Sequence, residues 1–434
     1  MDPLVAGMIG LVLFVVLLFF GVYIAVAMFL AGTVIIIMIL DLPKALQLLG
    51  STPFTVGSTY GYSCLPLFLL MGTFAVYAGV AEEALAVMYR WVSRLPGSLA
   101  VATTLGCGAF GAASGSSLAA ASVFTRAALP VMVKYKYDIK LVTGCIAASG
   151  TFATMIPPSI LLIVYGIFTE TSIAKLFLAG ILPGLITVLV YTVSIVLRVR
   201  RSPQLAPMSG EVFSWKDKVS ALPRLWTIAV LALVVIGGIY GGLFTPTEAA
   251  AVGALAAFVM NLRKNGLKHT YLPNALKETA YVTAQIFIII IGAVVLSRAI
   301  SLSQIPVEIV RFVSGLAVPR VIILTGFLVM YFLLGMVVTA SGMLAITLPV
   351  LTPIIISLGY DLIWFGIIAI KMCEIAVVTP PVGLNVYIVA GAAGKQATLE
   401  QIFAGIWPFV VCDFIVLALL IAFPQIILFL PNML

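Results

Sequence analysis

The feature that most constrains the fold of this chain is a series of apolar runs, such as residues 11–20, 286–296 and 415–430. They lie in apolar segments of about 20 residues, the length that a helix needs to cross a hydrocarbon layer about 30 Å thick. A transmembrane β-barrel would need short strands of alternating polarity, which the sequence lacks. With 63% hydrophobic and only 9% charged residues, the sequence predicts an all-α polytopic membrane protein.

The rarer residue types exclude several other classes of protein. The five cysteines are scattered through apolar segments without a CxxC pair, which argues against a disulfide framework or a zinc cluster. The single histidine, His269, cannot form a metal site alone. The net charge of +8 is expected from basic cytoplasmic loops and does not indicate nucleic-acid binding. The N-terminus carries an acid and no basic region, so the first apolar segment is predicted to be a retained span.

Hydropathy and helix breakers together predict ten spans and two longer apolar blocks. The blocks, 98–133 and 320–358, are interrupted centrally by small polar residues, so each is predicted to form two short helices folded back on each other. The ten spans lie near residues 4–20, 22–40, 62–80, 139–165, 174–198, 225–243, 246–262, 279–298, 361–391 and 399–430.

Two halves of the chain share one sequence plan. The segment "YDIKLVTGCIAASGTFATMIPPSI" (137–160) aligns with "YDLIWFGIIAIKMCEIAVVTPPVG" (360–383), which brings two Pro–Pro pairs into register. Two further pairs, "ALPVM" with "TLPVL" and "LAGILPG" with "FAGIWPF", follow at offsets of 219 and 225 residues. We therefore predict a first repeat over 1–200, a cytoplasmic linker over 201–224 and a second repeat over 225–434.

The two repeats are predicted to be inverted, because each holds five spans and an odd number reverses the side of entry. The loops agree, since "KYKYDIK" (134–140) is basic and its counterpart "SLGYD" (357–361) has no Lys or Arg. With the N-terminus outside, the first of these loops, the linker and the loop 263–269 share the cytoplasmic side, although Arg311 and Arg320 do not. Inverted repeats with broken helices are typical of secondary transporters.

The small-residue stretch "GCGAFGAASGSSLAAAS" (106–122) has a counterpart in "GMVVTASGM" (335–343). Small residues also let membrane helices pack closely, and for either stretch alone that alternative stays open. Their equivalent places in the two repeats favour re-entrant hairpins, whose tips leave backbone groups unsatisfied unless protein, water or an ion satisfies them. Because carbonyl, Ser and Thr oxygens suit a cation such as Na+, we expect cation-binding tips.

The two Pro–Pro pairs are predicted to break the spans 139–165 and 361–391 at mid-membrane, because proline removes a helix donor and clashes with the preceding turn. A purely structural kink is the alternative. Half-helix ends at these breaks would present positive N-terminal poles to an anionic substrate and free carbonyls to cations. The polar side chains near the breaks are Ser149, Thr151, Thr154, Thr379 and Asn385.

Charged residues within spans are few, and each is a candidate functional group. Lys371 and Glu374 lie three residues apart on one predicted helix, and we expect Lys371 to serve only as the partner of Glu374. Glu374 stays a candidate site residue because it lies close to a Pro–Pro pair. Arg126 and Arg298 either reach the membrane interface or contact an anion. Glu248 is expected to cap the start of a helix.

The motifs "GAASGSS", "IPPSI", "LAGILPG", "FTPTEAA" and "EIAVVTPPVGLN" resemble, essentially from end to end, the large membrane subunit (DctM-like) of TRAP transporters, the tripartite ATP-independent periplasmic transporters. The resemblance implies a Na+-coupled importer of a small organic acid in the bacterial inner membrane, with no enzymatic activity. It implies two protein partners, a small four-helix membrane subunit and a periplasmic substrate-binding protein. It also implies an elevator mechanism, in which hairpins and broken helices move against a scaffold.

Carried onto this sequence, the resemblance implies an ion and substrate site with Na+ as the coupling ion and no transition metal or other cofactor. One departure stands out, because the family usually has Asp where this chain has Thr339, and the number or affinity of bound cations stays open. The first hairpin contributes Gly111, Ser114, Gly115, Ser116 and Ser117, and the second Gly335, Thr339, Ser341 and Gly342. The broken helices contribute Ser149, Thr151, Thr154, Pro157, Pro158, Glu374, Thr379, Pro380, Pro381, Gly383 and Asn385.

Two alternatives stay open from the sequence. The first is a self-sufficient Na+/dicarboxylate symporter of similar hairpin architecture. The second, more remote, is an intramembrane aspartyl protease that uses Asp138 and Asp361, although corresponding ends of inverted repeats should hold these acids near opposite membrane faces. No feature of the sequence identifies the substrate or distinguishes a carboxylate from a sulfonate.

Overall fold

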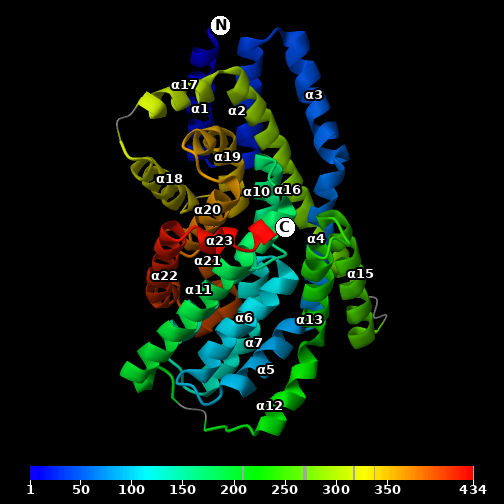
Figure 1. The fold of residues 1–434 in the computed structure, drawn as a ribbon, viewed down its shortest axis with the longest axis vertical. Helices are drawn as coiled ribbons and strands as arrows, with labels where there is room; N and C mark the ends of the chain where they lie inside the picture. The colour runs from blue at the N-terminus through cyan, green and yellow to red at the C-terminus, as the bar shows by residue number, and fades with distance from the viewer. Residues whose placement is uncertain (208–209, 267–270, 316–317, 337, 434) are drawn as a thin grey trace.

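The computed structural model describes the whole chain except residues 208–209, 267–270, 316–317, 337 and 434 (Figure 1). Over the described residues the secondary structure is helical throughout, which confirms the all-α prediction. Within this part of the chain, seven helices are long and apolar enough to cross a membrane, or eight if one bent pair counts as a span. The protein is therefore a multi-pass membrane protein.

The first half of the chain begins with scaffold-like helices and continues into a hairpin and a broken helix. Its helices are α1 (Pro3–Phe19), α2 (Ile24–Ile39), α3 (Leu42–Ser58), α4 (Cys64–Tyr77), α5 (Val80–Val92), α6 (Ser98–Ser114), α7 (Ser117–Lys134), α8 (Ile139–Ser149), α9 (Phe152–Met155), α10 (Ile160–Thr169) and α11 (Ile173–Arg201).

The second half follows the same plan after a partly helical linker. Its helices are α12 (Trp215–Ala221), α13 (Trp226–Ala232), α14 (Gly238–Tyr240), α15 (Pro246–Asn265), α16 (Tyr271–Leu302), α17 (Ile305–Gly315), α18 (Arg320–Gly335), α19 (Ala340–Ser357), α20 (Leu362–Ala376), α21 (Leu384–Ala393), α22 (Leu399–Ala422) and α23 (Gln425–Leu428). A π-helical turn, Leu233–Gly237, joins α13 to α14.

The order of elements from α5 to α11 recurs from α17 to α22, as the sequence repeat predicts. Each predicted hairpin block is a pair of helices, α6 with α7 and α18 with α19. Each predicted broken span is interrupted at its Pro–Pro pair, and α8–α9 is bent by 43° against α10. In Figure 1 the α6–α7 hairpin lies below the centre of the molecule and the α18–α19 hairpin above it.

The linker is more ordered than a simple loop between repeats. Ser214 and Asp217 form a capping box that starts α12, and the helical path continues from Trp215 to Tyr240. The helix thus begins about ten residues earlier than the predicted span 225–243, because a cap rather than hydropathy sets its start. The Tyr135 hydroxyl, just after α7, donates a 2.6 Å hydrogen bond to Glu211 Oε1, and this bond raises the pKa of Tyr135 to about 12.

The largest core lies where both repeats meet. The ring of Tyr191 on α11 lies between Phe152 of α9 and Phe409 of α22, with ring centroids 5.1 and 5.0 Å away. A second, smaller core joins α1 and α2 to α16, where Ala25, Met28 and Ala293 are fully buried or nearly so. The core around Tyr191 also includes buried residues of both hairpins, such as Phe110 and Tyr331, and we call the hairpins, the broken helices, α11 and α22 the packed unit. The same core continues onto α4, α15 and α16, and α2 and α16 border the packed unit on the side of the second core.

Candidate functional site

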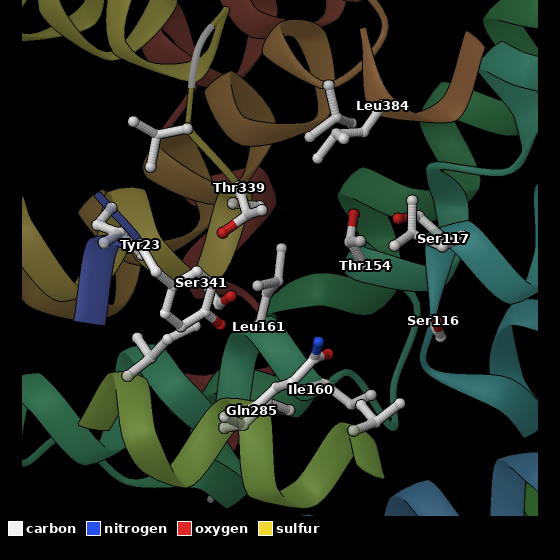
Figure 2. A pocket seen from close by; sticks show the side chains of 18 of the residues that line it. Tyr23, Ser116, Ser117, Thr154, Ile160, Leu161, Gln285, Thr339, Ser341 and Leu384 are labelled. Carbon is white, nitrogen blue, oxygen red and sulfur yellow. The ribbon is translucent and has the colours of Figure 1, made fainter. Parts of the chain in front are cut away.

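A cavity of about 570 Å³ lies between the tips of the two hairpins (Figure 2). The first hairpin contributes Gly115 to Leu118 and the second contributes Val338 to Ser341. The broken helices add Thr154, Ile160, Leu161, Val377 and Leu384, and the border helices α2 and α16 add Tyr23, Ile24, Val282, Gln285, Ile286 and Ile289. Among these lining residues none is charged, and the polar side chains are hydroxyls and one amide.

Five helices begin at the wall of this cavity. The first residues or caps of α7 (Ser116, Ser117), α19 (Thr339, Ala340), α10 (Ile160), α21 (Leu384) and α2 (Tyr23, Ile24) all line it. The first N–H groups of a helix have no partner within the helix, and the helix dipole makes this end electropositive. Helix C-terminal ends line the same cavity, at Leu18 of α1, Gly115 after α6 and Val377 after α20, so its wall offers both N–H donors for negative charge and carbonyl acceptors for cations.

The tip of the first hairpin is shaped by Gly115 and Ser116. Gly115 has a positive φ of +62°, and a Cβ there would lie 2.6 Å from the carbonyl oxygen of Pro158. Only glycine lets the tip turn this close to the first Pro–Pro break. Ser116 then caps α7, since its Oγ accepts a hydrogen bond from the N–H of Ala119 at 3.4 Å.

The tip of the second hairpin repeats this arrangement with different residues. Thr339 caps α19, and its Oγ1 accepts a hydrogen bond from the N–H of Gly342 at 3.3 Å. Gly335, at the end of α18, packs so closely on α20 that a Cβ there would meet the Cβ of Ala376. Each hairpin therefore packs against a broken helix. The first packs against the α9–α10 break and the second against the end of α20.

Two predicted site residues carry buried oxygens without a partner in the described part of the chain. They are Ser114, whose Oγ lies just before the first tip, and Asn385, whose Oδ1 lies in the first turn of α21. The amide of Asn385 donates to the carbonyl of Ala147 at 3.2 Å, which fixes the side chain and leaves Oδ1 available. Buried acceptors that lack donors are the groups that a cation can satisfy.

Most of the other predicted site residues do not line the cavity. Thr151 and Thr379 each hydrogen bond to a carbonyl of the preceding turn, and Ser149 donates to Thr104 Oγ1 at 3.2 Å. The structure therefore brings Gly115, Ser116, Ser117, Thr154, Thr339 and Ser341 to the cavity. The predicted residues that do not line it are Gly111, Ser114, Gly335, Gly342, Ser149, Thr151, Pro157, Pro158, Glu374, Thr379, Pro380, Pro381, Gly383 and Asn385.

Directly behind the cavity lies a fully buried charge network centred on Lys371. Its Nζ donates to Asp413 Oδ1 (2.7 Å), Glu374 Oε2 (2.9 Å) and Thr187 Oγ1 (3.2 Å), so all three of its protons have acceptors. The three charged side chains are at most 1% exposed. The pairing expected for Lys371 and Glu374 is confirmed, but a second carboxylate joins it.

The network reaches across both repeats. The hydroxyl of Tyr191 on α11 donates to Asp413 Oδ2 at 2.7 Å. Thr154 Oγ1 lies 2.9 Å from Glu374 Oε1 and also lines the cavity. Thr154 is therefore the contact between the uncharged cavity and the charged network. The positions equivalent to Lys371 and Glu374 in the first repeat, at the offset of 223 residues between the Pro–Pro pairs, are Ala148 and Thr151.

Sequence reasoning missed Asp413, Tyr23 and Gln285. Asp413 stands alone in the apolar run "IWPFVVCDFIVLALL", and the rule that charges in spans are functional candidates would have found it. Tyr23 and Gln285 come from α2 and α16, whose sequences carry no motif that points to the hairpins. Only packing brings them to the cavity.

The remaining charged candidates do not line the cavity. Glu248 forms a capping box with Thr245 at the start of α15, as predicted. Arg298 donates to Thr52 Oγ1 at 2.9 Å and does not line the cavity. Asp138 and Asp361 cap α8 and α20, each accepting from N–H groups of its own helix. His269 lies outside the described residues.

The chain matches the family described as the tripartite ATP-independent periplasmic transporter, DctM component, over residues 11–426. It is 33% identical to the C4-dicarboxylate TRAP transporter large permease protein DctM of Pseudomonas aeruginosa, over 90% of each chain. It is 31% identical to the ectoine/5-hydroxyectoine permease UehC of Ruegeria pomeroyi over 85% of each chain. It is 30% identical to the sialic acid permease SiaM of Vibrio cholerae over 85% of this chain and 86% of that one.

A comparison of folds gives a more distant likeness. The crystal structure of the Alcanivorax borkumensis YdaH transporter superposes on this chain with a TM-score of 0.61 and 16% sequence identity. The match covers 89% of this chain and 91% of that one. The two proteins share a fold, and this likeness by itself says nothing about substrate or ion.

Proposed function

Because the chain belongs to the DctM family of TRAP transporter large permease subunits, we propose that it imports a small organic anion together with Na+ across the bacterial inner membrane. The relatives are transport permeases and not enzymes, so an aspartyl protease is not supported. In this family the large permease works with a small membrane subunit and a periplasmic binding protein. We propose the same partners for this chain.

The observation that carries the proposal is the convergence of five helix N-termini on an uncharged cavity. A fixed Lys or Arg would hold a carboxylate strongly and slow its release. The N-terminus of each helix carries the equivalent of about +0.5 elementary charge, which attracts an anion. The hydroxyls of Ser116, Ser117 and Thr339 can donate hydrogen bonds to that anion. Such a site fits a cargo that must bind and then leave.

The hairpin tips and the first turn of α21 supply the oxygens that Na+ requires. Ser114 Oγ and Asn385 Oδ1 are buried and lack a donor in the described structure, and carbonyls of the hairpin ends lie beside them in sequence. Hard oxygen ligands of this kind suit Na+. Thr339 contributes a neutral oxygen where the family usually has a carboxylate, so we propose a weaker cation site at the second tip than at the first.

Movement of the packed unit against α2 and α16 is the transport step that we propose. The cavity has one wall from the hairpins and broken helices and another from Tyr23, Val282 and Gln285 on the border helices. If the first wall slides past the second, the cargo changes its side of access, which is the elevator mechanism. In this proposal both hairpins move together with the core around Tyr191, to which both contribute buried residues.

The names of the relatives give the class of cargo. They include permeases for C4-dicarboxylates, sialic acid and ectoine, which all carry at least one carboxylate. We propose a carboxylate or a related acid for this chain as well. Specificity within this class resides mainly in the binding protein, since the cavity itself offers only hydroxyls, an amide and helix ends.

Uptake by the reconstituted system tests the proposal. The purified chain, its small subunit and the binding protein encoded beside it are placed in proteoliposomes, and the acid is one that stabilises the binding protein thermally. We expect uptake only with an inward Na+ gradient and all three proteins. Uptake by this chain alone would favour the self-sufficient symporter, and uptake with K+ in place of Na+ would overturn the coupling ion.

A further inference from the structure

The linker between the repeats exposes an amphipathic surface at the end of the molecule opposite the N-terminus, where Figure 1 shows α12. Four apolar side chains point outward there, which we call the outer stripe: Trp215 is 72% exposed, Val219 55%, Leu222 43% and Trp226 42%. Their spacings of four, three and four residues place them on one face of the helical path Trp215–Tyr240.

Basic residues lie among and next to the outer stripe in the sequence and on the neighbouring helix α5. Lys216, Lys218 and Arg224 come from the linker, Arg90 from the last turn of α5 and Arg94 from the turn that follows it. Lys218 Nζ donates to the carbonyl of Trp91 at 3.2 Å and lies 5.6 Å from the ring centroid of Trp215. These contacts fix α12 against α5 and hold positive charge beside the outward tryptophan.

The acidic groups of this region are two, and both have local partners. Asp217 accepts from the backbone N–H and hydroxyl of Ser214 at the start of α12. Glu211 accepts from the hydroxyl of Tyr135. With five cations against two carboxylates, the surface has a net charge of +3.

The combination of outward apolar side chains with basic ones decides what the surface binds. An acidic soluble protein would satisfy the cations but would leave no reason for four exposed apolar side chains in a row. The interface of an anionic bilayer satisfies both, because tryptophan and lysine side chains lie at the headgroup level with their apolar parts toward the acyl chains. The helical path continues from here into an apolar span of mean hydropathy 2.1, which sets the stripe at the depth where the helix enters the bilayer.

We propose that residues 211–226, with the end of α5, bind the anionic phospholipid headgroups of the cytoplasmic membrane surface, with the outer stripe turned into the acyl-chain boundary. Electrostatic attraction to anionic headgroups adds to burial of the stripe. The surface is separate from the cavity, and the proposal holds whatever the cavity transports. It gives the linker a role as an anchor to the cytoplasmic membrane surface.

Spin-label accessibility in nanodiscs tests the position of the stripe. All five native cysteines are buried, so a single nitroxide can be attached at Val219→Cys and, as a matched control, at Ser220→Cys on the neighbouring face. We expect the label at 219 to be more accessible to lipid-soluble oxygen than to a water-soluble nickel complex, and the label at 220 to show the lower ratio. Preference of the 219 label for nickel, or its exclusion from both reagents by a covering protein, would overturn the proposal.

Lipid composition tests the electrostatic part. In nanodiscs that contain phosphatidylglycerol, the 219 label is expected to lie deeper than in phosphatidylcholine alone. The double variant Lys216→Gln/Arg224→Gln should lose this difference, as should salt of about 1 M, where the Debye length falls to about 3 Å. Equal depth in both lipids for the unsubstituted linker would show that anionic headgroups are not the ligand.

Discussion

The cavity and the charge network behind it are neighbours, yet they handle polarity in opposite ways. The cavity holds no charged side chain among its lining residues and relies on helix ends, hydroxyls and one amide. The network holds Lys371, Glu374 and Asp413 in contact with one another and buried from solvent. Charges at membrane depth are costly unless paired. The pairing in the network therefore holds α11, α20 and α22 together, and the cavity, with no charged side chain of its own, is left free to exchange a charged cargo.

The largest effect is expected from removing the cation of the network. Lys371→Met leaves two buried carboxylates without a counter-charge, which should lower the free energy of unfolding by about 3–5 kcal/mol. Denaturant titration in mixed micelles measures this. The control is Lys44→Met, whose ion pair with Asp41 is exposed and should cost at most about 1 kcal/mol. Equal stability of the two variants would show that the network is not held by its charges.

A smaller loss should follow from removing one neutral donor of the network. Tyr191→Phe keeps the ring between Phe152 and Phe409 but leaves Asp413 Oδ2 without its donor. We expect a destabilisation of about 1–2 kcal/mol in the same titration. Tyr240→Phe, at an exposed position, is the control and should be neutral. If Tyr191→Phe leaves the free energy of unfolding unchanged, Lys371 alone satisfies the carboxylate of Asp413.

Adding a charged side chain to the cavity tests the same difference between the cavity and the network. Thr339→Asp places a carboxylate at the second hairpin tip, where the cap of α19 already faces the cavity. A carboxylate near a bound cation should lower the NaCl concentration for half-maximal thermal stabilisation by about tenfold. Thr339→Ser is the control and should leave this NaCl concentration unchanged. KCl keeps the ionic strength the same in every measurement. An identical Na+ response in both variants would place the cation away from this tip.

The smallest effect is expected where the two regions touch. Thr154→Val removes the hydroxyl that lines the cavity and contacts Glu374, which should cost about 1 kcal/mol of stability. Thr154→Ser keeps a hydroxyl at this position and should keep the stability of the unsubstituted chain. In a double-mutant cycle with Glu374→Gln, the combined loss should differ from the sum of the single losses by about 0.5 kcal/mol or more. Additive losses would mean that the cavity and the network are independent.

Sequence reasoning went furthest where a local signal was strong. Both hairpins and both breaks were predicted from hydropathy, the Pro–Pro pairs and the small-residue stretches. This was possible because chain reversal and helix interruption depend on residues that are adjacent in the sequence. Sequence reasoning failed at Asp413, whose hydrogen-bond partners Tyr191 and Lys371 lie 222 and 42 residues away in the sequence. No periodicity encodes such a meeting.

The residues by themselves determined that this chain is a helical membrane protein with two matching halves, since burial in lipid demands long apolar helices and the repeat is visible in the letters. The tertiary structure decided that five helix starts converge on one cavity, that Tyr23 and Gln285 complete its wall, and that Lys371 has two acids rather than one. The physical reason is that a helix start or an unpaired charge is a local property, whereas its partner is chosen by the packing of distant segments.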